Sequence, residues 1–135
     1  MALAEHAVHL QKIAWQSVLT ISLPRLRPAA GGYVPQYPVS EEDLTRLIAA
    51  LRMLLPDAGI VLSTRESASL RDRLATAGVT MMSAGSRTEP GGYEEPEKAE
   101  GQFEIEDART PAEVADRLRA LGLDPVWKDW DAALG

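Results

Sequence analysis

The sequence has 135 residues, a formal net charge of −6 at pH 7 and an isoelectric point of about 4.9. This acidic balance argues against nucleic-acid binding, which requires a basic face. The chain contains no cysteine, which excludes disulfides, zinc–thiolate sites, iron–sulfur ligation by this chain and cysteine nucleophiles. No apolar run is long enough to span a membrane and the N-terminus lacks signal-peptide features, so we expect a cytoplasmic protein.

The first half of the chain reads as helix, strand, loop and helix. Apolar residues at helical spacing predict a helix over residues 4–16, and a β-branched run predicts a strand over residues 18–23. Prolines and glycines over residues 28–38 predict an irregular loop. Ser40 is the expected N-cap of a second helix, which Pro56 ends. The buried stripe of that helix is expected to comprise Leu44, Leu47, Ile48, Leu51 and Leu55.

A second strand and a third helix–strand pair follow. Residues 59–62 are continuously apolar, which predicts a strand covered by helices on both faces. A helix over residues 67–77 places Leu70 and Leu74 inward, and Gly78 supplies its left-handed C-terminal position. Residues 79–82 are the expected third strand.

The remainder of the chain is dominated by a loop and a last helix. Residues 84–101 are expected to form a long flexible loop, and residues 102–106 a short strand or extended segment. Thr110 to Glu113 form a capping box with proline at the first helical position, which predicts a helix running to Gly122. Trp127 and Trp130 are expected to pack on the body of the protein.

The alternation of strands and helices with short links predicts one α/β domain over residues 1–135, with parallel strands. Each strand leads into hydroxyl-bearing or arginine side chains. Because the carboxyl ends of parallel strands share one edge, where ligands bind in α/β proteins, we expect these side chains to converge. They are Arg25 and Arg27 after the first strand, Ser63, Thr64, Arg65 and Glu66 after the second, and Ser83 and Ser86 after the third.

An arginine binds a carboxylate bidentately, so Arg65 with Ser63 and Ser83 predicts a small-anion site. Glu66 would steady Arg65 or bind a substrate amine; alternatively, Arg65 and Glu66 pair with each other at the rim. Arg25 and Arg27 are either a second anion clamp or two solvated arginines.

Groups for bond-making chemistry are missing from these strand ends. No histidine lies there, so a Ser-His-Asp arrangement is not evident, and no P-loop lysine follows the glycines. His6 and His9 are three residues apart, but nothing completes a metal site with them. The pattern therefore favours binding and positioning over catalysis by this chain.

Four segments in this order resemble the C-terminal part of the 2-iminoacetate synthases, the radical SAM tyrosine lyases of thiamine (thiazole) biosynthesis. They read Ile-Ser-Leu-Pro-Arg-Leu-Arg-Pro-Ala (21–29), Leu-Ser-Thr-Arg-Glu-Ser (62–67), Met-Ser-Ala-Gly-Ser (82–86) and Pro-Val-Trp-Lys-Asp-Trp (125–130). The hydrogenase-maturation tyrosine lyase shares several of these segments, but the tryptophan-rich ending favours the thiamine branch.

The resemblance implies a partial (β/α) barrel: about three parallel βα units from the C-terminal half of a radical SAM barrel, of the biotin and thiamin synthesis associated type. Full enzymes of this family use a [4Fe-4S] cluster, held by three cysteines in the N-terminal half, and S-adenosylmethionine to cleave tyrosine to 2-iminoacetate (dehydroglycine) and p-cresol. By resemblance Arg65 would hold the tyrosine carboxylate, with Ser83 nearby and Arg25 and Arg27 lining the same cavity.

Without cysteine this chain holds no cluster, so we expect a substrate-binding portion that is inactive alone. The expected partners are tyrosine, the missing N-terminal half-barrel or a second copy, and, by family resemblance, thiazole synthase. The alternatives are a non-enzymatic module that binds an amino acid or a protein, the equivalent part of the hydrogenase-maturation lyase, and, more weakly, an independent hydrolase or transferase.

Overall fold

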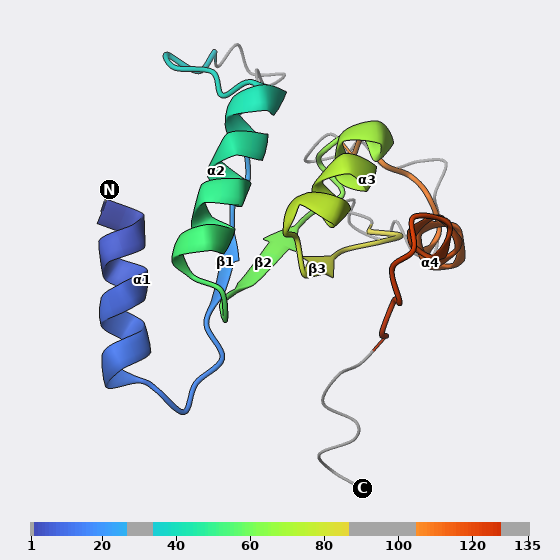
Figure 1. Ribbon diagram of the computed structural model, residues 1–135. Helices are drawn as coiled ribbons and strands as arrows, with labels where there is room; N and C mark the ends of the chain where they lie inside the picture. The colour runs from blue at the N-terminus through green and yellow to red at the C-terminus, as the bar shows by residue number, and fades with distance from the viewer. Residues whose placement is uncertain (1, 27–33, 87–104, 128–135) are drawn as a thin grey trace, which may run out of the picture.

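The computed structural model describes residues 2–26, 34–86 and 105–127 (Figure 1). Strands and helices alternate from the first helix to the third strand, as the sequence predicts. In chain order the elements are α1 (Ala2–Ile13), β1 (Thr20–Ser22), α2 (Glu41–Leu54), β2 (Gly59–Leu62), α3 (Ala68–Ala77), β3 (Met81–Met82) and α4 (Pro111–Ala120).

The three strands form one parallel sheet in the order β1-β2-β3, which confirms the predicted parallel pairing. Ile21 lies opposite Ile60, and Val61 lies opposite Met81. The strands are shorter than predicted: β1 keeps three of six expected residues and β3 two of four. β2 is the central strand, so its carboxyl end lies between those of its neighbours.

One face of the sheet is covered by helices, and the core lies between these two layers (Figure 1). Ile21, Ile60 and Leu62 project from the strands into this core. The residues that meet them come from α1, α2 and α3, and α4 packs beside α3. The helix residues of the core are Ala7, Leu44, Ile48, Leu51, Leu70 and Leu74.

The other face of the sheet carries no helix among the described residues. Thr20, Ser22 and Met81 are exposed, and Val61 is half-buried. The prediction that helices cover both faces of residues 59–62 is therefore wrong for this part of the chain. An apolar run in a central strand marks the need for cover on both faces, but it does not say which segment provides it.

The helix termini follow the local signals in the sequence. The Ser40 hydroxyl accepts a hydrogen bond from the Asp43 amide (3.0 Å), and the Asp43 carboxylate bonds back to the cap. Thr110 and Glu113 form the same reciprocal arrangement, with Pro111 at the start of α4. Within the α2 stripe one prediction is wrong, because Leu47 is 41% exposed.

Arg52, in the last turn of α2, ties together two turns at the opposite end of the sheet from the predicted site. Its guanidinium donates to the carbonyls of Pro56 (2.8 Å) and Ala58 (2.9 Å) before β2 and to that of Gly78 (2.8 Å) after α3. Gly78 has a φ of 127°, as expected for a left-handed helix end. These bonds supply donors to backbone carbonyls of the two turns, which lie beyond the ends of α2 and α3.

Several sequence predictions fall wholly or partly outside the described residues. From residue 87 onward, the predicted loop over residues 84–101 lies outside the described residues, as do residues 102–104, Trp130 and Arg27. Ile105 and Glu106 are not in a strand. Trp127 is 64% exposed, so the prediction that it packs on the body is wrong for the described chain.

Candidate functional site

The carboxyl ends of β2 and β3 lie side by side and bring two of the predicted serines next to each other. The Ser83 amide donates to the Leu62 carbonyl (3.0 Å), so the parallel pairing continues one residue beyond β3. Continuing the register of Leu62 opposite Met82 places Ser63 opposite Ser83. Neighbouring strands lie about 4.8 Å apart, within reach of one small ligand.

Burial alternates along the chain as β2 passes into the turn before α3. Thr64 and Glu66 are 3% and 2% exposed, whereas Ser63 and Arg65 are half-buried. Thr64 and Glu66 turn into the protein and fix the turn, and Ser63 and Arg65, which alternate with them, keep partial access to solvent. Ser63 and Arg65 are therefore partly exposed at the sheet edge, and Ser86, also half-buried, lies beyond β3.

Glu66 is held by Arg25, which follows β1. Arg25 Nε donates to Oε1 of Glu66 at 3.0 Å and Nη2 donates to Oε2, a bidentate pair with side chains 11% and 3% exposed. Nη1 of Arg25 also donates to the Val39 carbonyl before α2 (3.1 Å). The hydrogen bond with Glu66 is the main cause that raises the pKa of Arg25. Arg25 thus joins the ends of β1 and β2 and is not a solvated arginine.

A second ion pair, not predicted from the sequence, lies beneath the ends of β2 and β3. Arg71 of α3 and Asp107 are fully buried, and Nη1 of Arg71 donates to Oδ2 of Asp107. Nη2 of Arg71 donates to the carbonyl of Ser83. Asp107 also accepts from Arg109 Nε at 2.9 Å and Nη2 at 2.7 Å. Arg109 in turn donates to Asp72 (3.0 Å), which extends the network to the surface.

The oppositely charged groups of this network shift one another's pKa values in the direction that favours their ionised forms. Burial works against ionisation of Asp107, but hydrogen bonds from Arg109 and the nearby positive charges of Arg71 and Arg109 hold its pKa below the usual range. Burial lowers the pKa of Arg71, against the effect of Asp107. The hydrogen bond to Asp107 is the main cause that raises the pKa of Arg109. Arginine stays protonated in proteins, so the buried pair is ionic at neutral pH.

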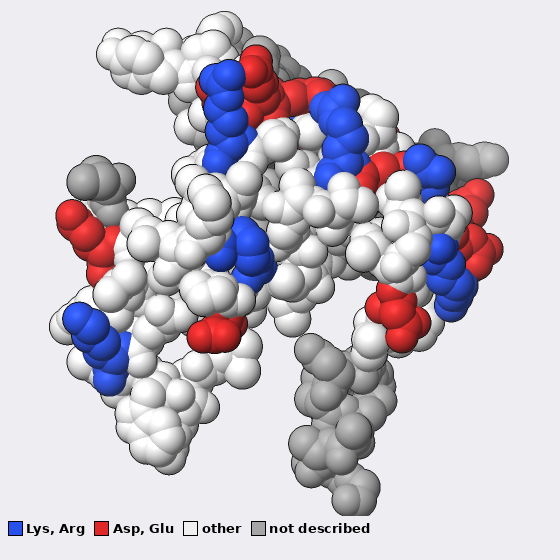
Figure 2. Space-filling view, viewed as in Figure 1, with Lys and Arg blue, Asp and Glu red and all other residues white. Residues whose placement is uncertain are grey.

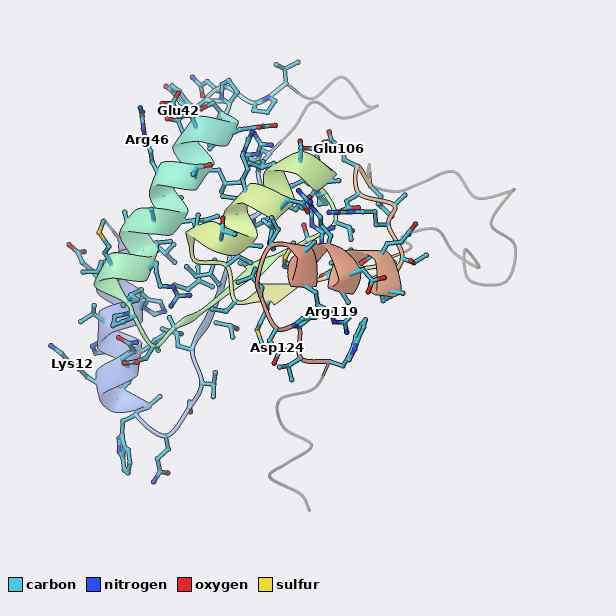
Figure 3. All side chains as sticks on the ribbon, turned by 45° about the vertical axis from the view of Figure 1, so that its right-hand side comes forward. Lys12, Glu42, Arg46, Glu106, Arg119 and Asp124 are labelled. Carbon is cyan, nitrogen blue, oxygen red and sulfur yellow. The ribbon has the colours of Figure 1, made fainter. Side chains whose placement is uncertain are left out.

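Residues 105–109 cross the strand ends and close the site from one side. The amides of Glu106 and Asp107 donate to the Thr64 carbonyl at 3.1 and 3.2 Å, and the Gly85 amide donates to the Arg109 carbonyl at 3.3 Å. Glu106 lies where this segment passes the beginning of α3 (Figure 3). The segment thus contacts the turns after both β2 and β3.

An apolar cavity of about 560 Å³ lies apart from these polar groups, between the open edge of β3 and α4. Met81, Met82, Val114 and Leu118 contribute to its lining, and Trp127 forms part of its rim. Among its described lining residues only Asp124, labelled in Figure 3, is charged. Because its described lining offers no cation, this part of the structure does not favour a carboxylate in the cavity.

The charges on the face of the molecule drawn in Figure 2 do not mark a second candidate site. Figure 2 shows basic and acidic side chains spread over one face of the molecule, with no patch of a single sign. In the described ranges no cluster of three or more His, Cys, Asp or Glu residues could hold a metal ion. No helix among the described residues is long and apolar enough to cross a membrane.

Comparison with known proteins identifies a family model and two relatives that match most of the chain. The family model described as "Biotin and Thiamin Synthesis associated domain" matches residues 22–124. The chain is 46% identical over 132 residues to the 2-iminoacetate synthases of Salmonella typhimurium (strain LT2) and Escherichia coli (strain K12). The match covers 98% of this chain and 35% of each relative, so the chain spans about a third of their length.

Two solved structures share the fold at substantial identity. A crystal structure of HydG, described as a maturase of the [FeFe]-hydrogenase, matches with a TM-score of 0.80 and 40% identity, over 92% of this chain and 27% of that one. HydG from Carboxydothermus hydrogenoformans, a FeFe-hydrogenase maturase, matches with a TM-score of 0.73 and 38% identity, over 90% and 28% of the two chains.

Proposed function

The chain belongs to the Biotin and Thiamin Synthesis associated domain family, and we propose that it is the substrate-binding C-terminal portion of a radical SAM tyrosine lyase of the 2-iminoacetate synthase type. The observation that carries this proposal is the edge where Ser63 and Ser83 lie opposite each other beside Arg65. Its support is the 46% identity to 2-iminoacetate synthases over nearly the whole chain.

We further propose that the sheet is part of a (β/α) barrel. Three parallel strands with helices on one face match three units of such a barrel, whose inner face is filled by side chains of all its strands. The bare face of this sheet and the outer edges of β1 and β3 are where the remaining units of the enzyme would join. The relatives are nearly three times as long, which leaves enough chain for those units.

Within this site Arg65 binds the carboxylate of tyrosine, because a guanidinium forms two parallel hydrogen bonds with a carboxylate. The hydroxyls of Ser63 and Ser83 donate to the same group, and Ser86 completes the surroundings. Arg25 contributes through Glu66: the pair orders the turn that carries Arg65. The carboxylate of Glu66 accepts from Arg25 at both oxygens, so its role is to hold this turn and not to receive a substrate amine.

The residues of this chain do not fit the [4Fe-4S] cluster of the parent enzymes, because such clusters are held by cysteine thiolates and the chain has none. We propose that the cluster and S-adenosylmethionine are held by the part of the enzyme that this chain lacks. The isolated chain then binds tyrosine but forms no 5′-deoxyadenosine. Formation of that product by the isolated chain would contradict the assignment.

Calorimetric titration with tyrosine tests the binding role. The unmodified chain is expected to bind tyrosine, and Arg65→Ala to remove most of that binding. Arg46→Ala is the matched control, since Arg46 is an exposed arginine of α2 paired with Glu42. Equal tyrosine affinity in the Arg65→Ala and Arg46→Ala variants would contradict the proposed role of Arg65.

The likeness to HydG favours a second candidate, the equivalent portion of a hydrogenase-maturation lyase. Both candidates place the tyrosine carboxylate at the same strand ends, so the titration does not separate them. Complementation does: the chain is fused to the N-terminal part of either enzyme, and growth of a thiamine auxotroph is compared with recovery of hydrogenase activity. We expect growth without thiamine; recovery of hydrogenase alone would favour the second candidate.

A further inference from the structure

The buried pair Arg71–Asp107 connects both strand ends that carry the candidate site. One connection runs to β2: the Asp107 amide, together with that of Glu106, donates to the carbonyl of Thr64. Thr64 directly precedes Arg65. The other connection runs to β3, where Nη2 of Arg71 donates to the Ser83 carbonyl. One ion pair therefore spans the two turns that present Arg65 and Ser83.

The sheet itself holds these turns only weakly. β3 has two residues, and near the site its pairing with β2 is continued by one bond, from the Ser83 amide to the Leu62 carbonyl. A buried ion pair is a poor source of net stability, because desolvation of both charges offsets their attraction. The pair does, however, fix the distance between the two turns that it joins, since arginine donates along fixed directions and both partners here are fully buried.

We propose that Arg71 and Asp107 are positioning residues for the carboxylate-binding site, and that they set the gap between Arg65 and the Ser83 hydroxyl. This inference rests on the proposed function. Neither residue touches the substrate. Arg71 acts through the main chain of Ser83, and Asp107 acts by holding Arg71 and by fixing the turn at Thr64.

Two variants separate this role from a purely structural one. In the double variant Arg71→Met with Asp107→Leu, apolar side chains replace both charges of the pair, an exchange that buried pairs often tolerate. Arg109, which also bonds Asp107, keeps its ion pair with Asp72 in this variant. Arg71→Lys keeps a positive charge beside Asp107 but lacks the fork that reaches both Asp107 and Ser83. Arg119→Met with Asp116→Leu is the control, because it removes an exposed pair on α4; Figure 3 labels Arg119.

The readout is a comparison of tyrosine with tyramine, which has the same ring and amine but no carboxylate. Titrations are made with the full chain, and far-UV circular dichroism verifies folding. Both Arg71 variants are expected to bind tyrosine roughly tenfold more weakly, the order expected for impaired charge-assisted hydrogen bonds. Their affinity for tyramine is expected to match that of the unmodified chain, and the control to bind both ligands normally.

The other outcomes contradict the inference. Unchanged tyrosine affinity in both variants, or equal losses for tyrosine and tyramine, would overturn the positioning role. Unfolding of both variants would also overturn it and would make the pair a stability element. Arg65→Ala separates this failure from failure of the proposed function: if Arg65→Ala weakens only tyrosine while the Arg71 variants do not, the inference alone is wrong. If Arg65→Ala has no effect, the proposed function is wrong.

Discussion

The substitution Glu66→Gln isolates the charge of the ion pair that joins β1 to β2. Gln keeps the size of Glu66 and one acceptor oxygen, but it leaves the guanidinium of Arg25 without its carboxylate. The Glu66 side chain is 3% exposed and that of Arg25 is 11% exposed, so the remaining charge stays largely out of water. Breaking a buried pair in this way costs about 3–5 kcal/mol, and the slight exposure of Arg25 favours about 3 kcal/mol.

The matched control is Glu42→Gln, the same chemical change in the pair that Glu42 forms with Arg46 on α2. Figure 3 labels both residues on the outer side of the helix. Their side chains are 72% and 71% exposed, and such a pair contributes only about 0.3–0.5 kcal/mol. The two variants therefore differ in burial and not in chemistry.

Urea unfolding followed by circular dichroism measures both effects. With a slope of about 1.5 kcal/mol per molar urea, Glu66→Gln lowers the midpoint by about 2 M and Glu42→Gln by about 0.3 M. Midpoints that fall equally in the two variants would refute the reasoning. That result would mean that water reaches Arg25 and Glu66 in solution and that the pair does not order the turn before α3.

Three further outcomes follow from other parts of the structure. Because the pKa of Asp107 is lowered in the folded protein, its carboxylate adds stability that is complete above the unfolded pKa of about 3.9 and is lost as the pH falls through the folded pKa. The urea concentration at the unfolding midpoint is therefore expected to fall when the pH is lowered below about 4. It is expected to fall less in the variant with Arg71→Met and Asp107→Leu. Gly78→Ala is expected to destabilise the protein more than Gly122→Ala in the same assay. Both glycines have a positive φ, where a side chain costs about 1–2 kcal/mol of stability. Only at residue 78 would the added Cβ also contact Arg52, at 3.1 Å. Ser40→Ala removes the acceptor for the Asp43 amide and lowers the free energy of unfolding by about 1 kcal/mol; an unchanged midpoint would show that the cap is not formed.

The parts of the fold that the sequence predicts are those specified by neighbouring residues. Ser40, Thr110 with Pro111, and Gly78 mark helix ends because their side chains or backbone act on amides and carbonyls a few residues away. The parallel order follows from alternation of element types. Strand lengths were overestimated, since a strand ends where its partner ends, and partners lie some 20 to 40 residues away in this chain.

The candidate site was predictable only in part, for the same reason. Ser63 and Ser83 are visible in the sequence because each follows an apolar run, and the register places them opposite each other. The burial of Arg71, next to Leu70 in α3, was missed, since its partner Asp107 lies 36 residues further on. The pairing of Arg25 with Glu66, 41 residues apart, was missed as well.

The sequence does contain a signal for the Arg25–Glu66 pair, because residues of opposite charge follow two successive strands. Arg25 follows β1 and Glu66 follows β2, and parallel neighbours bring such residues together at one edge. The sequence interpretation instead weighed Glu66 against its chain neighbour Arg65. The Arg25–Glu66 pair shows that residues far apart along the chain meet when both follow strands at the same edge of the sheet.

The most direct test of the central claim is a graft. This chain replaces the matching 132 residues of the Escherichia coli 2-iminoacetate synthase, whose remaining part then supplies the rest of the enzyme. The account predicts that the graft releases p-cresol from tyrosine, and that Arg65→Ala in the graft abolishes p-cresol while Arg46→Ala does not. A folded graft that still cleaves S-adenosylmethionine but releases no p-cresol, or one in which Arg65→Ala is fully active, would contradict the account.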